Sequence, residues 1–212
     1  MNSTLYTKLL QLGEEHSHPE DPTHDFSHIQ RVLKNAEVIA VSEGGDLDIL
    51  VPAALFHDVV NYPKTDPCAS RASDESAAWT VALLKTFPDY PQEKCDAVYD
   101  AIAKCSFNKG IVPTLLESKI LQDADGLEAT GAISILRTFA STGQYKRSFY
   151  NSDDTFCVTR EPNPLNYALD LFYARLLKII DRIHTPSARV IAERRHAFLL
   201  TFLEEFKLEL AE

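Results

Sequence analysis

The stretch ALFHDVVNY, residues 54–62, places a histidine and an aspartate side by side near the end of an apolar run. The alanine, leucine, phenylalanine and valine side chains around the pair are typical of a helix buried in a protein core. His57 and Asp58 do not fit that environment, because a buried carboxylate costs free energy unless it is paired or bound to a metal. The stretch therefore predicts an apolar helix with a polar site at its edge.

Apolar residues recur with helical spacing along most of the chain, as they do from Ile29 to Ala40. We expect a helix that is capped by Asp48, runs into 56–60 and ends before Pro63, and a next helix that is started by Ser73 or Asp74 and covers 77–87. A helix with Pro113 in its first turn carries Ile120, and the last helix has Thr185 as its N-cap and Pro186 as its first residue. Three further helices are expected over 91–107, 127–139 and 165–180. No period-2 strand pattern is evident. The sequence therefore predicts an all-α fold, a single helical bundle over residues 1–212 with C-terminal helices in 164–211.

Composition and charge narrow the classes of function. The chain of 212 residues is 45% apolar and has a net charge of −10 without a dense Lys/Arg block, which argues against nucleic acid as a partner. No apolar run has the length of a membrane span, and the N-terminus becomes polar too early for a signal peptide. The four cysteines lack CxxC spacing. We therefore expect a reduced, cytoplasmic protein without a membrane partner.

One long segment, residues 141–164, has no helical pattern. A loop of that length is typically functional or disordered. It contains Lys146, Arg147 and Arg160, which makes it a candidate mobile cover for an anionic substrate. A solvated connection explains the composition equally well, and both interpretations stay open.

Several polar residues lie close to the apolar pattern: His28, the pair His57 and Asp58, and the two aspartates of QDADGLEATG (122–131), Asp123 and Asp125. Taken singly, each is more typical of a hydrogen-bonded core residue or a helix cap. Together, imidazoles and carboxylates are ligands that suit a divalent Mn, Fe, Ni, Zn or Mg ion, without selecting among them. Adjacent residues project about 100° apart on a helix. The pair can still converge on one ion, because an imidazole reaches further than a short carboxylate.

Three motifs in this order carry a resemblance to a known family: THDFSHIQRV (23–32), ALFHDVV (54–60) and LQDADGLEATGAISILR (121–137). They resemble the HD superfamily of metal-dependent phosphohydrolases, whose signature is H…HD…D. The motif core covers about 20–140, and the segments 169–179 and 188–206 are similar to the C-terminal helices of small bacterial stand-alone HD proteins. The resemblance implies an all-α fold and a divalent metal ion held by His28, His57, Asp58 and Asp125.

The resemblance also implies hydrolysis of a phosphate ester or anhydride of a small molecule. Some members of the subgroup are similar to nucleotide pyrophosphohydrolases, so a nucleotide is one candidate substrate. Asp58 is then a candidate catalytic residue that accepts a proton from the attacking water, besides acting as a ligand. The candidate phosphate contacts are the basic residues near the motifs and in the long loop: Lys64, Arg71, Lys104, Lys146, Arg147 and Arg160. Each alone is equally typical of a solvated surface charge.

The chain departs from its relatives at three positions. Cys105 stands where relatives often have histidine, Asn61 where some have a glutamate that acts as acid or base, and Gly126 where relatives often have a basic residue. These differences affect extra ligands and substrate contacts rather than the proposed metal ligands.

Some roles and two competing functions stay open. His24 and Asp25 either orient His28 or begin a helix, and Asp123 either supports the ligands or caps a helix. A di-iron oxygenase would need more histidine ligands than the sequence offers. A non-catalytic binding or sensing module would keep the metal as a structural staple with every coordination position closed by protein. The sequence predicts no oligomeric state.

Overall fold

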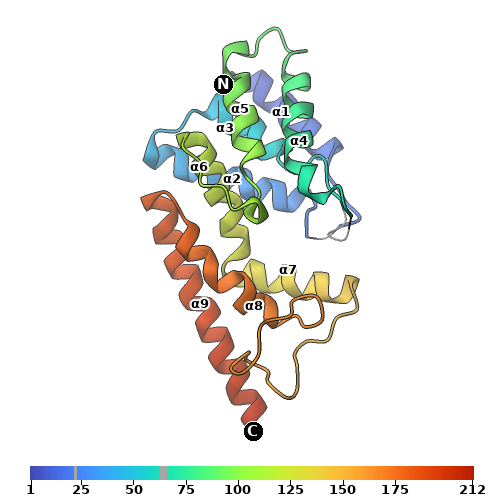
Figure 1. The fold of residues 1–212 in the computed structure, drawn as a ribbon. Helices are drawn as coiled ribbons and strands as arrows, with labels where there is room; N and C mark the ends of the chain where they lie inside the picture. The colour runs from blue at the N-terminus through green and yellow to red at the C-terminus, as the bar shows by residue number, and fades with distance from the viewer. Residues whose placement is uncertain (22, 63–65) are drawn as a thin grey trace. The chain divides into compact units, whose positions relative to one another are not determined.

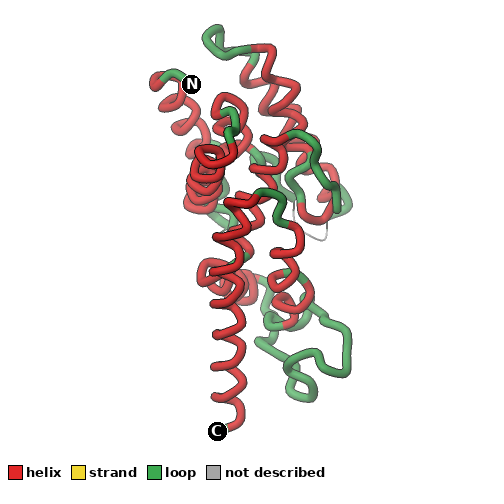
Figure 2. Tube along the Cα trace, turned by 90° about the vertical axis from the view of Figure 1, so that its left-hand side faces the viewer, coloured by secondary structure: helices red, strands yellow, loops and turns green. Residues whose placement is uncertain are grey.

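The computed structural model describes residues 1–21, 23–62 and 66–212, except for the side chain of Asn108. Its α-helices are α1 (Ser3–Glu15), α2 (Phe26–Glu43), α3 (Leu47–Phe56), α4 (Ala72–Leu84), α5 (Cys95–Ala103), α6 (Leu116–Gly126), α7 (Gly131–Gln144), α8 (Asp170–Ala174) and α9 (Pro186–Ala211) (Figure 1). Short 3-10 helices lie at Ala69–Arg71, Gln92–Lys94, Phe107–Lys109, Leu127–Ala129 and Leu176–Arg182. Within the described ranges no segment forms a strand, and Figure 2 shows helices joined by loops. The predicted all-α class is confirmed.

The chain forms two compact units, Met1–Asp125 and Gly126–Glu212. The assignment of residues 1–212 to one domain stays a prediction, because compactness alone does not decide whether a unit folds independently. Among the helices that the structure describes, none is both long enough and apolar enough to span a membrane. The cytoplasmic location also stays a prediction.

Helix α3 is the central helix of the first unit, and it packs against α1, α2, α4 and α5. Every residue from Ile49 to Phe56 is buried. A helix that is apolar around its whole circumference must be surrounded by other elements, because no face of it suits water. Burial on all sides therefore fixes the position of the residues at its C-terminal end, where His57 and Asp58 follow.

A proline inside α3 leaves one carbonyl without its helical donor. Pro52 has no N–H, so the carbonyl oxygen of Asp48 loses the hydrogen bond that a residue four positions later would donate. The buried hydroxyl of Tyr90 donates to that oxygen over 2.9 Å. Burial raises the pKa of Tyr90, which keeps its hydroxyl protonated as a donor. The helix can therefore continue past the proline to its end.

The boundaries of α3 differ from the prediction. Asp46 is the N-cap, and its carboxylate accepts a hydrogen bond of 2.9 Å from the backbone N–H of Asp48, the residue predicted to be the cap. The helix ends at Phe56, and His57 is its C-cap. The expected continuation of the helix through the His-Asp pair was therefore wrong, and the pair lies in the turn after α3. Pro63 lies outside the described residues.

Helices α4 to α6 are shorter than predicted. Ser73 and Asp74 lie in the first turn of α4 and neither caps it. The helix predicted over 91–107 is α5, flanked on each side by a 3-10 turn. Pro113 precedes α6, which begins at Leu116. The elements themselves were predicted, and their ends were not, because caps depend on tertiary contacts as well as on residue type.

Helices α1 and α3 approach each other closely at one glycine. A Cβ atom added to Gly13 would lie 3.1 Å from Cδ2 of Leu55. That separation is tighter than ordinary van der Waals contact, so the absence of a side chain at Gly13 allows the two helices to pack at this distance. Leu55 lies two residues before His57 in the sequence, so this contact bears on the backbone that leads into the polar pair.

The second unit begins with a broken helix. The predicted helix over 127–139 is interrupted between the 3-10 turn Leu127–Ala129 and α7. Gly131 has a φ of +68°, a left-handed conformation that favours glycine, and a Cβ atom there would lie 3.1 Å from Cβ of Arg195. The prediction of one continuous helix was wrong, because the apolar spacing does not reveal the backbone reversal at this glycine.

The single long helix predicted over 165–180 was also wrong. Leu165 lies in a loop with 75% of its surface exposed. Helix α8 is only five residues long, and Arg175 leaves the helical region with φ −138° and ψ −57° before a 3-10 segment begins. Helix α9 starts as predicted, with Thr185 at the N-cap position and Pro186 as its first residue.

The loop between α7 and α8, visible in green in Figure 2, closes on itself within the second unit. Asp170 is fully buried at its end. Its carboxylate accepts hydrogen bonds from both terminal nitrogens of Arg160, at 2.7 Å for Nη2, and from the backbone N–H of Asn163. An isolated bridge between Ser148 and Tyr167 joins the two ends of the loop. The segment is held by specific bonds, and its role as a mobile cover stays a prediction.

Candidate metal centre

His28 lies in the first turn of α2, and its side chain is completely buried. Asp25 is the N-cap of this helix, and its carboxylate accepts a hydrogen bond of 3.0 Å from the backbone N–H of His28. Of the two roles open for Asp25, the structure shows the helix start. Capping fixes the first turn of α2, and with it the backbone position from which the imidazole projects.

His24 is held by a different carboxylate. Its Nδ1 atom lies 2.7 Å from Oδ2 of Asp21, and the hydroxyl of Thr23 donates to the other oxygen of the same carboxylate. The ring of His24 meets the ring of His28 edge-on, with the centroids 5.7 Å apart. The hydrogen bond to His24 lowers the pKa of Asp21 against the opposing effect of burial. His24 therefore packs beside the imidazole of His28.

His57 presents one ring nitrogen to the site. Its Nδ1 atom lies 2.9 Å from the carbonyl oxygen of Ala54, and because a carbonyl only accepts, Nδ1 carries the proton. In the neutral ring, Nε2 then has a free lone pair. This atom is buried and has no hydrogen-bond partner among the residues that the structure describes. A metal ligand usually has its second ring nitrogen fixed in this way.

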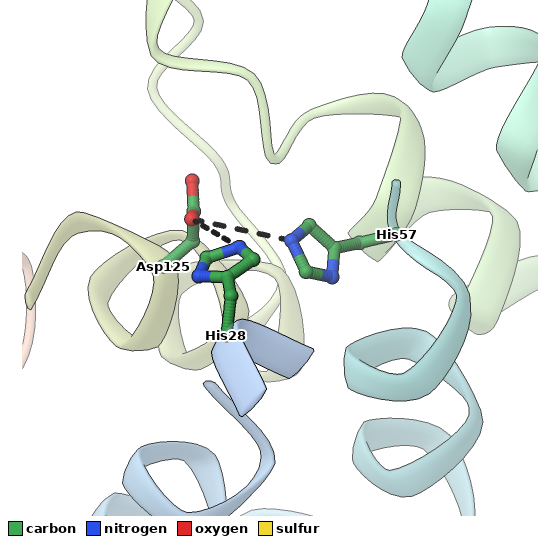
Figure 3. Close-up of side chains that lie close together, drawn as sticks. All are labelled: His28, His57 and Asp125. Carbon is green, nitrogen blue, oxygen red and sulfur yellow. Dashed lines mark ion pairs between the residues drawn. The ribbon is translucent and has the colours of Figure 1, made fainter. Parts of the chain in front are cut away.

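Asp125, in the last turn of α6, completes a cluster with the two imidazoles (Figure 3). Its Oδ1 atom lies 3.7 Å from Nε2 of His28 and 4.0 Å from Nε2 of His57, and the ligand atoms of all three residues lie within 4.8 Å of one another. Two atoms bound at about 2.1 Å on opposite sides of an ion lie about 4.2 Å apart. The cluster can therefore hold a metal ion after a small contraction.

Asp58 faces the same two imidazoles. Its Oδ2 atom lies 3.3 Å from Nε2 of His57 and 3.8 Å from Nε2 of His28. Burial raises the pKa of this carboxyl, but the neighbouring imidazoles outweigh burial and hold it well below its usual range. Burial lowers the pKa of His57, and Asp58 outweighs that effect and raises it to about 9. The four residues predicted as metal ligands thus lie together in the first unit.

Asp123 and Cys105, both considered in the sequence, are buried in the first unit. Asp123 is buried inside α6, so it is not a helix cap. Cys105 is buried, and burial raises the pKa of its thiol well above the usual value, with a further contribution from the charges of Asp125 and Asp58. Among the described residues, the group whose ligand atoms converge consists of two histidines and an aspartate and does not include this cysteine.

The basic residues predicted as substrate contacts have partners of their own. Arg71 is 63% exposed at the start of α4 and lies 3.5 Å from Glu75. Lys104 forms an ion pair with Asp100. Lys64 lies outside the described residues. The assignment of these three residues stays a prediction.

The remaining basic candidates belong to the second unit. Arg160 is paired with Asp170, and Arg147 donates over 2.7 Å to the carbonyl oxygen of Pro164 and also to the hydroxyl of Ser141. These bonds close the loop within its own unit and account for both arginines without a substrate. Lys146 is exposed in the turn after α7. The substrate role of all three stays a prediction.

One residue that contacts the cluster was missed by the sequence reasoning. Nε2 of His18 donates a hydrogen bond of 3.2 Å to the backbone carbonyl oxygen of Asp58. His18 lies in the connection between α1 and α2, 40 positions before its partner. The only signal in the sequence was the density of histidines in HSHPEDPTH, residues 16–24.

Comparison with known proteins is consistent with this arrangement. A family model for the HD domain matches residues 25–130, the range that contains all four predicted ligands. The chain is 30% identical to YpgQ of Bacillus subtilis over 195 residues, which are 90% of this chain and 86% of YpgQ. The crystal structure of YpgQ in complex with ADP matches with a TM-score of 0.73 and covers 96% of this chain and 97% of its own.

Two other crystal structures match at 30% identity. The Lin1889 protein of Listeria innocua has a TM-score of 0.75, with 100% of this chain and 98% of its own covered. An HD-superfamily hydrolase of Bacillus thuringiensis has a TM-score of 0.71, with 98% and 97% covered. The similarity in each case extends over both units of the chain.

Proposed function

Because this chain belongs to the HD domain family, we propose that it is a metal-dependent phosphohydrolase that cleaves a phosphate ester or anhydride of a small molecule. The observation that carries the proposal is the convergence of His28 from α2, His57 from the turn after α3 and Asp125 from α6, with Asp58 beside them. These residues lie far apart in sequence, and their meeting in one buried cluster has no evident role in packing. The shared fold with the hydrolase of Bacillus thuringiensis supports the same reaction class.

The donor set suits a divalent metal ion. Nε2 of His57 is buried, lies 3.3 Å from Oδ2 of Asp58 and makes no hydrogen bond with a described residue, so an ion that displaced the proton from this nitrogen would bind its lone pair. Two imidazoles and two carboxylates provide nitrogen and oxygen ligands that fit Mn, Fe, Ni, Zn or Mg. A bound ion would lower the pKa of a water molecule and neutralise charge on a phosphoryl oxygen.

The protein residues contribute orientation and proton acceptance. Asp25 and Ala54 fix the backbone and ring positions of the two histidines through the bonds described above. Asp58, with 35% of its side chain exposed, is the most solvent-exposed of the four proposed ligands. The imidazoles hold its pKa well below the usual range, so it is ionised at neutral pH and has a free oxygen toward the attacking water, while the same lowered pKa and ligation make it a weak proton acceptor.

We infer that the substrate carries a nucleoside di- or triphosphate group. YpgQ, which is 30% identical and matches over nearly the whole chain, has a crystal structure in complex with ADP. The present chain has a net charge of −10, so an anionic substrate needs a local cation, which the ion at the cluster would supply. Of the basic residues in the first unit that the structure describes and that were predicted to contact substrate, Arg71 has the most exposed side chain. It would add a contact to phosphate.

The test is a hydrolysis screen on protein stripped of metal with a chelator and then reloaded. Nucleoside di- and triphosphates and sugar phosphates are incubated with Mn²⁺, Mg²⁺ or no metal, and products are identified by phosphorus NMR. We expect hydrolysis of at least one nucleotide that requires added metal. The matched control is His57→Gln, which removes one ring nitrogen from the cluster and should be inactive under the same conditions.

The screen also separates the competing functions. Protein that binds one metal ion tightly but hydrolyses nothing in a broad panel would favour the non-catalytic module. Two irons per chain with oxygen consumption would favour the di-iron oxygenase. Hydrolysis that proceeds at full rate without metal would contradict the proposed mechanism, because the cluster would then have no part in it.

A further inference from the structure

We propose that His18 is a positioning residue that sets the place of Asp58 in the metal centre. The proposal deepens the function proposed above and depends on its metal-binding part. His18 does not point at the cluster itself. It acts through the backbone of Asp58, to which its Nε2 atom donates over 3.2 Å.

The backbone after α3 needs such partners. The last carbonyl groups of a helix have no N–H donor within the helix, and a buried carbonyl without a donor costs free energy. At the end of α3, the ring of His57 donates to the carbonyl of Ala54. The ring of His18 donates to the carbonyl of Asp58 four residues later. Two imidazoles therefore stabilise the turn that carries the His-Asp pair.

A third side chain anchors the same turn from another helix. Ser76, which is fully buried in α4, accepts a hydrogen bond of 3.0 Å from the backbone N–H of Val60. His18 comes from the connection that precedes α2, and Ser76 comes from the helix that follows the turn. The backbone of Asp58 is thus held between α3 and two segments that are distant in sequence.

The position of this backbone matters because the side chain of Asp58 is short. Its Oδ2 atom must reach both imidazoles, at 3.3 Å from His57 and 3.8 Å from His28. An aspartate has only two side-chain torsions, so a displaced backbone cannot be compensated as it could be with a longer glutamate. Metal sites tolerate displacements of only about 0.5 Å in their ligands. A bond that fixes the backbone of Asp58 therefore fixes the ligand.

The bond does not depend on the charge of His18. The carbonyl of Asp58 is an acceptor only, so Nε2 must carry a proton, which it does both in one neutral tautomer and in the charged ring. The other ring nitrogen of His18 lies 3.7 Å from Glu20, which is 76% exposed and offers only a weak, solvent-screened contact. The hydrogen bond to Asp58 is the specific contact of this side chain.

The test compares four variants by their affinity for Mn²⁺, measured by calorimetric titration of metal-free protein. His18→Phe keeps a flat ring of similar size and removes the donor. His18→Ala removes the donor without an aromatic ring, in case the phenylalanine disturbs folding. His18→Gln restores an N–H donor at a similar reach. His16→Phe is the matched control, because the Nδ1 atom of His16 bonds to the carbonyl of Leu12 in its own helix.

We expect His18→Phe and His18→Ala to weaken Mn²⁺ binding by about 10- to 100-fold, the usual effect of losing a group that orients a metal ligand. His18→Gln should recover most of the affinity, and His16→Phe should retain it. The melting temperature of the metal-free protein should fall by a similar, small amount in His18→Phe and His18→Ala, because each loses one partly buried hydrogen bond, and the apolar core is unchanged in all four variants.

The outcomes separate this proposal from the proposed function. Wild-type affinity in His18→Phe and His18→Ala would overturn the positioning role. So would an equal loss in His16→Phe, or a failure of His18→Gln to recover affinity. Wild-type protein that binds Mn²⁺ but hydrolyses no substrate would contradict the phosphohydrolase function alone, and the affinities of the variants would still decide the role of His18.

Discussion

Nε2 of His57 and Oδ2 of Asp58 lie 3.3 Å apart, although the two residues are neighbours in the chain. Consecutive residues of a helix project about 100° away from each other. His57 keeps helical torsions, with φ −60° and ψ −29°, so the end of α3 at Phe56 does not by itself explain the convergence. The two atoms meet because the imidazole reaches further than the short carboxylate and because the ring of His57 is fixed by its bond to Ala54.

We predict that Asp58→Ala nearly abolishes metal binding in a folded protein. The change removes a ligand and a negative charge. Removing only a residue that supports a ligand typically lowers metal affinity 10- to 100-fold, so we expect the loss of the ligand itself to lower the affinity by at least about 100-fold. The apolar helix α3 is unaffected, so the far-UV circular dichroism spectrum should be retained. Asp89→Ala, at an exposed position outside the cluster, is the control. Full metal content in Asp58→Ala would rule out its role as a ligand.

We predict that Arg71→Ala raises the KM for an anionic substrate and leaves kcat nearly unchanged. The side chain of Arg71 is 63% exposed, so its attraction for phosphate is screened, and we expect an increase in KM of about threefold. A change confined to KM indicates a contact that is equally strong in the ground state and the transition state. Lys85→Ala, at the opposite end of α4, is the control. An equal rise in KM for both variants would point to a general effect of net charge instead.

We predict that Asp170→Asn destabilises the second unit. The substitution leaves the buried end of the α7–α8 loop without the charge that pairs with Arg160, and breaking a buried ion pair costs about 3 kcal/mol. The urea midpoint by circular dichroism should fall, and the loop should be cleaved faster by a protease. Asp153→Asn, in an exposed part of the same loop, is the control. Unchanged midpoints in both variants would mean that the ion pair contributes nothing to stability.

The same residue gives a prediction for pH. Burial raises the pKa of Asp170, but the hydrogen bonds from Arg160 and Asn163 outweigh it and hold the pKa below 3.8, its ordinary value. A carboxyl with a lowered pKa contributes stability that is complete above its unfolded pKa and is lost as the pH falls through the folded value. The difference in unfolding free energy between wild type and Asp170→Asn should therefore be full at neutral pH and shrink below about pH 4. A difference that is the same at neutral and acid pH would contradict this account.

The long amphipathic helices were predictable from sequence, whereas several ends and breaks were not. The apolar spacing from Ile29 to Ala40 gives α2, because one face of a helix must be buried. The same kind of spacing runs across Arg175, where the backbone leaves the helix, and a hydrophobic pattern contains no information about that torsion. The end of α3 was missed for a related reason, since its apolar residues continue past Phe56 to Val59 and Val60.

In the candidate site too, some residues could be predicted from the sequence and others could not. The four proposed ligands could be named because three motifs, in their order, resemble those of the HD superfamily. The partners that hold them in place could not. His18 contacts the backbone of Asp58, and a backbone carbonyl is identical at every position, so nothing in the sequence marks which one a distant imidazole will reach.

The close approach of Gly13 and Leu55 limits how this sequence can diverge. A larger residue at position 13 would push against Leu55 and move the end of α3, along with the histidine that follows two residues later. A smaller residue at position 55, such as valine, would make room for that change. We therefore expect positions 13 and 55 to covary among homologues, so that alanine at position 13 is accompanied by a smaller side chain at position 55. Selection on metal coordination would then act on two residues that carry no polar side-chain atom.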